Sequence, residues 1–551
     1  MPSPESPSPD SALLRSVEGQ SLSQRLPVYL KLSGPGWLQS AITLGGGSLS
    51  GSLYLGVLGG FGLLWLQPLA MIMGIVMLMA IGYVVMHTGR RPLGAIAEHV
   101  NPVLAFGWAA ASLVASMVWA MPQYSLAIGV LQQNLLPGWL GATGPFGEFG
   151  GRLLPTAVVL AFSTYITWNY TKGGRGVKIY EGILKVMVGV IVACFAGVIL
   201  RLTFSPGGLD WGATFAGFVP DFTLLGRPAD AFLPLIEATD AAHRAFWTSV
   251  IVDNQRDVIV AAAATAVGIN MTFLFPYSIL RRGWGKEFVG LCRFDLATGM
   301  FIPFVLATSF VVMAAASQFH AAPQPGLLNA AGEVQYSGAA SARQVREFET
   351  LLAKVPTAAE APVSNADRTL AAMLVTRDAS HLAAALEPLT GPFIGRIIFG
   401  LGVLGMTLST ITLLMLISGM VVCEFFNRPL TGWTFRLGSL LAASGALGPF
   451  LWSKASFWLA VPTSVFAFIL MPIAYLTFFL MMNQRSLLGD AMPRGAARWR
   501  WNVLMGACLA VVGGASAFML WKKGGVWGLS AAGVFLAAAL VVDLRRRAAR
   551  S

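Results

Sequence analysis

Two glycine-rich breaks interrupt apolar stretches of this 551-residue chain, and they carry the residues best suited to hold a small solute. The first break, Gly45-Gly46-Gly47-Ser48, lies within an apolar run over residues 34–58. The second lies within a run over residues 257–281 and contains Gly268, Asn270, Met271 and Thr272. Glycine costs a helix about 1 kcal/mol per position relative to alanine. Irregular backbone persists at membrane depth only where it is buried in protein or lines a cavity, so its freed carbonyls could hold an ion or a polar solute.

Either break alone could merely allow close helix packing, since small residues have that role in membranes. Two breaks at matching places, five apolar runs apart, instead indicate the binding site of a transporter built from two repeats. Neutral side chains are expected around this site: Ser48, Gln123, Asn270, Met271, Thr272, Ser409 and Thr410, beside the backbone of Gly45 and Gly47. Ser48 and Met271 are the expected metal ligands. The hydroxyls of Ser409 and Thr410 could alternatively serve only in hydrogen bonds within or between helices.

Composition places both breaks in a membrane. The chain is 56% hydrophobic and 11% charged, whereas soluble proteins carry about 25% charged residues. Twelve apolar runs are long enough to cross a bilayer: 34–58, 62–88, 103–135, 153–171, 178–203, 257–281, 294–317, 391–426, 435–452, 457–483, 502–521 and 525–544. The expected fold class is therefore an all-α polytopic membrane protein with about 12 transmembrane helices.

The distribution of basic residues gives the orientation and argues against a nucleic-acid partner. The formal net charge is +12, but the Lys and Arg residues form short clusters between apolar runs rather than one basic face. Clusters of this kind stay on the cytoplasmic side. They predict a multi-pass protein of the cell inner (plasma) membrane with both termini cytoplasmic. The chain contains no Walker or HExxH motif, so neither an enzyme nor a cofactor is expected. Its partners are the lipid bilayer and a small ion or solute, and the oligomeric state is left open.

The runs divide the chain into five expected parts. They are a disordered cytoplasmic tail without a signal peptide (1–32), a first repeat of spans 1–5 (33–203), an extracytoplasmic loop (204–256), a second repeat of spans 6–10 (257–483) with an extracytoplasmic insertion (318–390), and spans 11–12 with a basic cytoplasmic tail (484–551). One helix is expected in the insertion, near 341–354.

Charged residues are scarce within the runs. Glu181 and Lys185 lie four residues apart near the inner end of span five. We expect them to form either a structural ion pair or the contacts of a gate that couples ion movement to transport. Asp295 and Glu424 lie at the ends of spans seven and eight and are expected at the membrane interface.

Several short motifs, in order and spacing, resemble those of the Nramp divalent-metal transporters. Ser33-Gly34-Pro35-Gly36-Trp37 resembles the Gly-Pro-Gly that opens this family's span one, and Asn483-Gln484-Arg485-Ser486-Leu487-Leu488-Gly489 resembles the ending of its span ten. The similarity runs from Gly34 to about Asp490, with residues 325–378 as an insertion. The resemblance implies a LeuT-type fold of two inverted five-helix repeats, in which helices 1 and 6 are broken, and alternating access as the mechanism.

The chain departs from the family at the expected binding site. The family's metal motif in span one is Asp-Pro-Gly-Asn, and the matching positions here are Gly45, Gly46, Gly47 and Ser48. In span six Met271 matches the family's methionine, but Thr272 and Phe273 replace the proline and the proton-handling histidine. Dehydrating a divalent ion without a negative ligand is costly.

Three functions therefore stay open. The first is transport of a divalent cation of the Mg²⁺/Mn²⁺ class through an altered, wider site. The second is transport of a neutral or zwitterionic organic solute. The third is a sensor without flux.

Overall fold

The computed structural model describes residues 9–170, 175–205, 208–356, 362–377, 381, 387, 391, 393–451 and 459–549. Within these residues the regular secondary structure is helical, and the single β-bridge joins Leu328 to Val334. Eight of the described helices are long and apolar enough to cross a membrane, and the bent pair of helices in span one makes a ninth. The prediction of an all-α polytopic membrane protein is confirmed.

Each of the twelve expected spans corresponds to a helix or a run of helices. In chain order these are α3 (Pro35–Thr43) with α4 (Gly46–Gly59), α5 (Leu66–Thr88), α7 (Pro102–Val130) with η1 (Leu131–Leu135), α9 (Gly147–Tyr170), α10 (Arg175–Thr203), α13 (Ala241–Ala266) with α14 (Ile269–Arg282), α15 (Val289–Leu296) with η5 (Ala297–Phe301) and α16 (Ile302–Phe319), η6 (Phe393–Ile398) with α20 (Phe399–Phe425), α21 (Gly432–Ala443) with η7 (Ser444–Leu447) and α22 (Gly448–Leu451), α23 (Ala460–Met482), and the two halves of α25 (Gly495–Ala548). The halves of α25 meet at Gly525, whose φ of 56° lies in the left-handed region and produces a kink.

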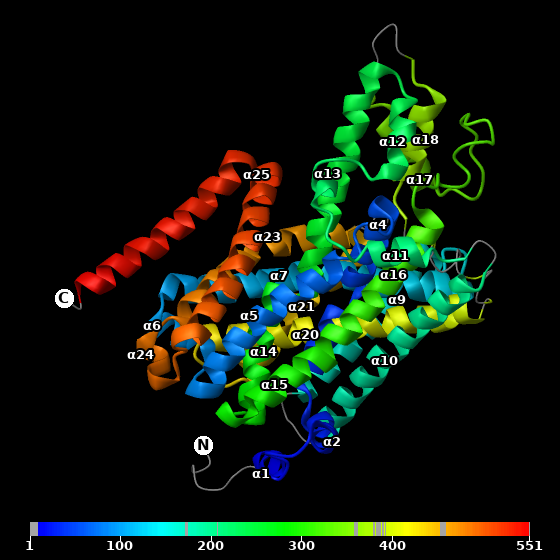
Figure 1. Cartoon of the computed structure of the whole chain (residues 1–551). Helices are drawn as coiled ribbons and strands as arrows, with labels where there is room; N and C mark the ends of the chain where they lie inside the picture. Colours follow the sequence, from blue (N-terminus) through cyan, green and yellow to red (C-terminus); the bar gives the residue numbers. More distant parts are fainter. Residues whose placement is uncertain are drawn as a thin grey trace.

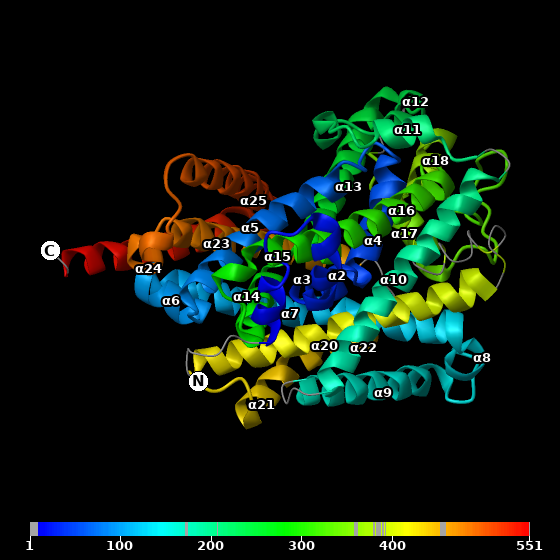
Figure 2. The same ribbon diagram turned by 60° about the horizontal axis from the view of Figure 1, so that its bottom comes forward.

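The broken helices occupy the centre of the bundle. In the most apolar window of the α13–α14 span, 94% of the residues are buried, whereas the corresponding windows of α9 and α25 are 28% buried. Figure 2 shows α9 and α25 at opposite edges of the bundle, with α3, α4, α13 and α14 between them. Lipid can therefore cover α9 and α25, whereas the backbone freed at the breaks is enclosed in protein, as the absence of water in a bilayer requires.

The N-terminal segment corrects one expectation. Residues 9–32 do not form a disordered tail, because they contain α1 (Pro9–Arg15) and α2 (Leu22–Leu32). The Gln24 side chain accepts from the Ser21 amide at 3.3 Å and so caps the start of α2. Tyr29 packs edge-on against Phe294 of α15, with ring centroids 5.3 Å apart. Composition alone missed these helices because they are short and their apolar residues find their partners in distant segments at the end of the bundle.

A second correction concerns the segment before span six. Helix α13 begins at Ala241, so residues 241–256 belong to this helix and not to a loop. Its first turns project beyond the bundle and pack with α12 (Leu233–Glu237) and α18 (Asn365–Leu374), and α17 (Ala342–Leu352) packs in turn with α18 (Figure 1). We call this unit the cap. Helix α17 confirms the helix expected near 341–354.

A buried carboxylate holds the cap together. Asp367 of α18 is fully buried and accepts hydrogen bonds from Trp247 Nε1 (2.7 Å) and His243 Nδ1 (3.1 Å) of α13, and from the amide and hydroxyl of Ser364 (2.7 Å each). Burial alone would raise the pKa of Asp367, but the hydrogen bonds from Ser364, Trp247 and His243 outweigh it and hold the pKa below its ordinary value. These bonds tie α18 to α13.

The first prediction is that Asp367→Asn destabilises the protein. Removing one partner of a buried charged network costs about 3 kcal/mol, and thermal unfolding in detergent measures it as a drop of several degrees in Tm. Because the pKa is depressed, the carboxylate stabilises the wild type at neutral pH, and this contribution is lost as the pH falls below about 4. The control is Asp230→Asn, whose side chain is 79% exposed. Equal melting temperatures for Asp367→Asn and wild type at pH 7 would contradict the role of this carboxylate.

Candidate functional site

The two breaks adjoin each other in the centre of the bundle. Helices α3 and α4 differ in direction by 56°, and α13 and α14 are separated at Val267–Gly268. Across the breaks, Thr43 Oγ1 lies 3.4 Å from the carbonyl oxygen of Ala266 and 3.5 Å from the sulfur of Met271. The broken spans one and six, predicted from the glycines, are thus confirmed and brought together.

The thioether of Met271 lies at this junction. Met271 is fully buried, and its sulfur also accepts a hydrogen bond from the Gly268 amide at 3.3 Å. The last carbonyls of α3 and α13 belong to helix C-termini, where a partial negative charge favours cations. The sulfur, the Thr43 hydroxyl and the Ala266 carbonyl are therefore three neutral groups that can donate electron pairs to a metal ion.

The other two polar residues of the second break have different surroundings. Thr272 Oγ1 donates to the Ile269 carbonyl (2.5 Å) and accepts from Trp108 Nε1 (2.9 Å), so its hydroxyl joins α14 to α7. Asn270 is fully buried; its Oδ1 accepts from the Met271 amide at 2.9 Å, while its Nδ2 has no hydrogen-bond partner among the described residues. A buried amide in this state is a ready donor for a bound solute.

Most of the remaining predicted residues line one small cavity beside the first break. Its volume is about 10 Å³ and its described lining is Ile42, Gly45, Gly47, Ser48, Trp119, Pro122, Gln123, Thr265, Thr410, Ala460, Thr463 and Ser464. Gln123 Oε1 accepts from the Gly46 amide at 3.0 Å, so the backbone N–H of the first residue of α4 has a hydrogen-bond partner. Ser409 lies outside the cavity, and its hydroxyl bonds to the Ala41 carbonyl in α3 at 2.9 Å. The cavity has room for about one water molecule.

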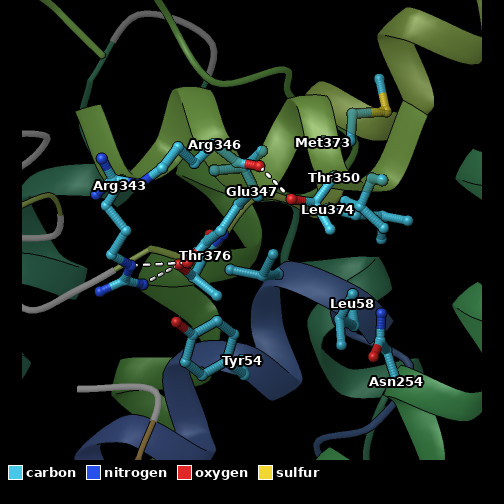
Figure 3. Close-up of a pocket in the computed structure, with 13 residues that line it drawn as sticks. Tyr54, Leu58, Asn254, Arg343, Arg346, Glu347, Thr350, Met373, Leu374 and Thr376 are labelled. Atoms are coloured by element: carbon cyan, nitrogen blue, oxygen red, sulfur yellow. Dashed lines mark hydrogen bonds and ion pairs between the residues drawn. The ribbon is translucent and has the colours of Figure 1, made fainter. Parts of the chain in front are cut away.

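Two larger cavities lie on either side of this small one. One, of about 340 Å³, is lined by α3, α14 and α20 and includes Arg91, Tyr170, Tyr277, Ser278 and Arg281. The other, of about 540 Å³, lies between the end of α4 and the cap. Figure 3 shows this second cavity, with Arg343 and Glu347 of α17 reaching Thr376 above Tyr54 of α4. None of the described residues lines two of the three cavities, so the small cavity is distinct from the two larger ones.

A buried carboxylate fixes the N-terminus of α3. Asp295 is fully buried, and its two oxygens accept from the amides of Gly34 (3.0 Å) and Gly36 (2.5 Å). A Cβ atom on Gly36 would lie 2.3 Å from the Asp295 carbonyl oxygen, which explains a glycine at that position. The Gly-Pro-Gly motif marks the start of α3 in the sequence, but the sequence did not reveal that Asp295 is the partner of its amides.

Two cations complete this latch, which we define as Asp295, Lys185 and Arg282 around the start of α3. Lys185 Nζ donates to the Ser33 carbonyl at 3.1 Å, and Arg282 Nη1 donates to the Leu32 carbonyl at 2.9 Å. Lys185 thus contacts the start of α3, whereas the side chain of Glu181 lies outside the described residues. Glu424 forms an ion pair with Arg91 at 3.1 Å, and its side chain is 6% exposed.

Helices long and apolar enough to cross a membrane, with two adjoining broken spans at the centre of the bundle, define a polytopic membrane protein with the fold of LeuT-type transporters. The chain belongs to the Nramp family: the model for "natural resistance-associated macrophage protein-like" proteins matches residues 36–342 and 357–522. The residues between the two matched ranges, 343–356, include all of α17 in the cap except its first residue.

Solved structures and curated relatives agree with this family. Two variants of the Eremococcus coleocola manganese transporter superimpose with TM-scores of 0.62 and 0.61 over 96% of this chain and 98% of theirs, at 14% and 13% identity, which shows the shared fold. "Metal transporter Nramp2" of Populus trichocarpa is 29% identical over 168 residues, and its namesake in Arabidopsis thaliana is 32% identical over 113. These matches cover 30% and 20% of this chain and 28% and 21% of the relatives, respectively.

The second prediction concerns the latch. Asp295→Ala leaves the amides of Gly34 and Gly36 without their acceptor, and hydrogen bonds to a charged group are worth about 1.5–3 kcal/mol each. The start of α3 should therefore separate more often from α15. A cysteine introduced at Ser278, which lines the 340 Å³ cavity, should then react about tenfold faster with a bulky thiol reagent.

The matched control is Asp490→Ala in the same Ser278→Cys background, because the Asp490 side chain is fully exposed. The chain without the introduced cysteine gives the background rate. An unchanged rate in the Asp295→Ala protein would show that the carboxylate does not restrain α3.

Proposed function

We propose that the chain is a secondary transporter of the cell inner (plasma) membrane, with both termini cytoplasmic, that moves a divalent cation of the Mg²⁺/Mn²⁺ class by alternating access. The observation that carries this proposal is the position of the Met271 sulfur between the two breaks, 3.5 Å from Thr43 Oγ1. Membership of the Nramp family and the manganese and metal transporters among its relatives support the same class of cargo.

The site would bind its ion differently from one that contains a carboxylate. The described residues include no group of three or more His, Cys, Asp and Glu that could hold a metal ion. The donors would instead be the Met271 thioether, the Ala266 carbonyl and the Thr43 and Ser48 hydroxyls, assisted by the C-terminal ends of α3 and α13. Neutral donors bind a divalent ion weakly, so we expect low affinity and little discrimination among divalent ions.

A second candidate is a zwitterionic or neutral organic solute. It is favoured by the unpartnered Nδ2 of Asn270 and by the two arginines, Arg91 and Arg281, that line the 340 Å³ cavity. A carboxylate could be guided by these arginines and held at the N-terminal end of α14. A sensor would bind its ligand without carrying it across the membrane, so flux measurements separate it from both transporters.

The third prediction tests the metal-binding role of Met271. Proteoliposomes of the wild type should take up Mn²⁺ or Mg²⁺ saturably, and the pH inside them shows whether protons accompany the ion. Met271→Leu keeps the volume but removes the thioether, so Mn²⁺ uptake at subsaturating concentration should fall about tenfold.

Met313→Leu is the control, since this methionine is buried in α16 away from the breaks. Absence of uptake of either ion by folded wild-type protein would refute the metal proposal and leave an organic solute or a sensor. Equal uptake by Met271→Leu and wild type would exclude the sulfur as a ligand.

The fourth prediction concerns the family's carboxylate position. A Cβ atom on Gly45 would lie 2.5 Å from Thr410 Oγ1 and 3.0 Å from the Ile42 carbonyl oxygen, so an aspartate there clashes with α20. The double substitution Gly45→Asp with Thr410→Ala removes the clash and supplies a negative ligand. Its affinity for Mn²⁺, measured by calorimetry, should exceed that of wild type by at least about tenfold and also that of Gly45→Asp alone. No gain in the double variant would contradict the proposed position of the ion.

A further inference from the structure

The cavity of about 540 Å³ beneath the cap, which we call the cap cavity, has no part in the proposed binding of a metal ion. Its walls are the outer end of α4, α13, α17 and residues 373–376, where α18 ends (Figure 3). None of its described lining residues belongs to α7, α20 or α23, which all line the small cavity. Sites for small organic molecules typically have volumes of about 300–1,000 Å³, so the cap cavity could hold one.

The charges that line the cap cavity leave one arginine without a partner. Arg343 Nε donates to Glu347 Oε1 at 2.7 Å, and Glu347 Oε2 accepts from the Thr376 hydroxyl at 2.6 Å. Arg346 lies one turn further along α17 and also lines the cavity. Its guanidinium forms no hydrogen bond or ion pair with any of the described residues. Since the carboxylate of Glu347 already pairs with Arg343, the guanidinium of Arg346 is available to a ligand.

A second unpaired arginine adjoins the cavity. Arg377 follows Thr376 in the chain, and its carbonyl accepts a hydrogen bond from Tyr54, which lines the cavity. Arg377 is 1% exposed; its Nη2 donates to the Ala322 carbonyl at 2.8 Å, but Nε and Nη1 have no partner among the described residues. Burial lowers the pKa of Arg377 to about 10, so the side chain is still charged at neutral pH. A buried charge without a counter-ion is costly, so an anion bound nearby would be favoured.

The rest of the lining indicates what kind of anion fits. Six of the thirteen described lining residues are apolar: Val57, Leu58, Leu351, Met373, Leu374 and Val375. Such a surface gains from covering a hydrocarbon chain or ring, and it offers little to a strongly hydrated inorganic anion. A guanidinium binds a planar carboxylate through two parallel hydrogen bonds. Asn254 of α13 lies on the wall opposite Arg346, and its half-buried amide bonds to no described residue (Figure 3).

We propose that the cap cavity binds a small organic monocarboxylate, whose carboxylate pairs with Arg346 and whose apolar body covers the aliphatic side chains of the lining. A polar group at the far end of the ligand would reach Asn254. Arg346 lies outside the ranges that match the family, so membership of the family does not account for this site. The ligand would contact α4 and α13, the outer halves of both broken spans, together with the cap. Slower transport in the presence of the acid rests on the proposed function, but binding does not.

Ligand-dependent stability of the full chain in detergent tests the binding. Melting temperatures are measured at constant pH and ionic strength while sodium chloride is replaced by sodium butyrate, hexanoate, phenylacetate or 4-hydroxyphenylacetate. We expect a saturable rise in Tm. Hexanoate and phenylacetate should bind more tightly than butyrate because they bury more apolar surface. Phenylacetamide, which has a similar shape but no charge, and inorganic phosphate should each bind at least about tenfold more weakly than phenylacetate.

Substitution of Arg346 tests the position of the carboxylate. Arg346→Gln should weaken the apparent affinity for phenylacetate about tenfold or more, and Arg346→Lys, which keeps the charge but not the planar pair of donors, should give an intermediate value. Arg346 is exposed, so neither variant should impair folding. Arg368→Gln is the matched control, because this arginine of the cap donates to Asn365 at 3.0 Å and does not line the cavity.

Three results would overturn the proposal. The first is a Tm that none of the four acids raises relative to chloride. The second is equal affinity for phenylacetate in Arg346→Gln and wild type. The third is equal affinity of the wild type for phenylacetamide and phenylacetate, which would show a site that does not recognise the carboxylate.

Uptake assays separate this proposal from the proposed function. A protein that binds phenylacetate but takes up neither Mn²⁺ nor Mg²⁺ would support the carboxylate site and refute the divalent cargo. Mn²⁺ uptake by a protein without affinity for any of the four acids would refute the site and leave the divalent transporter standing. Where both hold, phenylacetate should slow Mn²⁺ uptake by the wild type more than uptake by Arg346→Gln.

Discussion

The constraint on which this structure depends is that every backbone group freed by a broken helix must be satisfied without water. The break after Thr43 and the break after Ala266 release amides and carbonyls in the centre of the bundle. Side chains satisfy several of them: Gln123 of α7 accepts from the Gly46 amide, Ser409 of α20 donates to the Ala41 carbonyl, and Met271 accepts from the Gly268 amide at the start of its own helix, α14. The first two contacts join α7 and α20 to the first broken span. We propose that polar groups at the same place hold an ion.

The distribution of charge is the second organising feature. The small cavity at the breaks is lined by neutral described residues, while the buried carboxylates of Asp295 and Asp367 lie at the two ends of the molecule. Asp295 fixes the start of α3, and Asp367 joins α18 to α13, which is the outer half of the other broken span. Strong electrostatic contacts therefore hold the ends of the two broken spans, and weak, neutral donors surround the proposed ion. A protein that must release what it binds benefits from this separation.

The spans and the positions of both breaks could be predicted from the sequence, because the length of an apolar run and the cost of glycine in a helix are local properties. Contacts between distant residues could not. Asp295 accepts hydrogen bonds from the amides of Gly34 and Gly36, which lie about 260 positions away in the chain. The pattern of apolar residues does not indicate which distant residues pair. Ser409 and Thr410 are neighbours in one run, yet the first bonds to Ala41 and the second lines the cavity. Only the rotation of α20 about its axis separates the two roles. The helices of residues 9–32 were missed for a related reason, since their stability comes from packing rather than from composition.

The central claim is that an ion binds at the junction of the two breaks among neutral donors. Anomalous X-ray diffraction from crystals grown with Mn²⁺ tests it most directly, because the signal locates the metal regardless of how transport is coupled. The account predicts one strong peak between the breaks, within coordination distance of the Met271 sulfur and the Ala266 carbonyl oxygen. A peak confined to the cap or to the surface, with none at the junction, would contradict it.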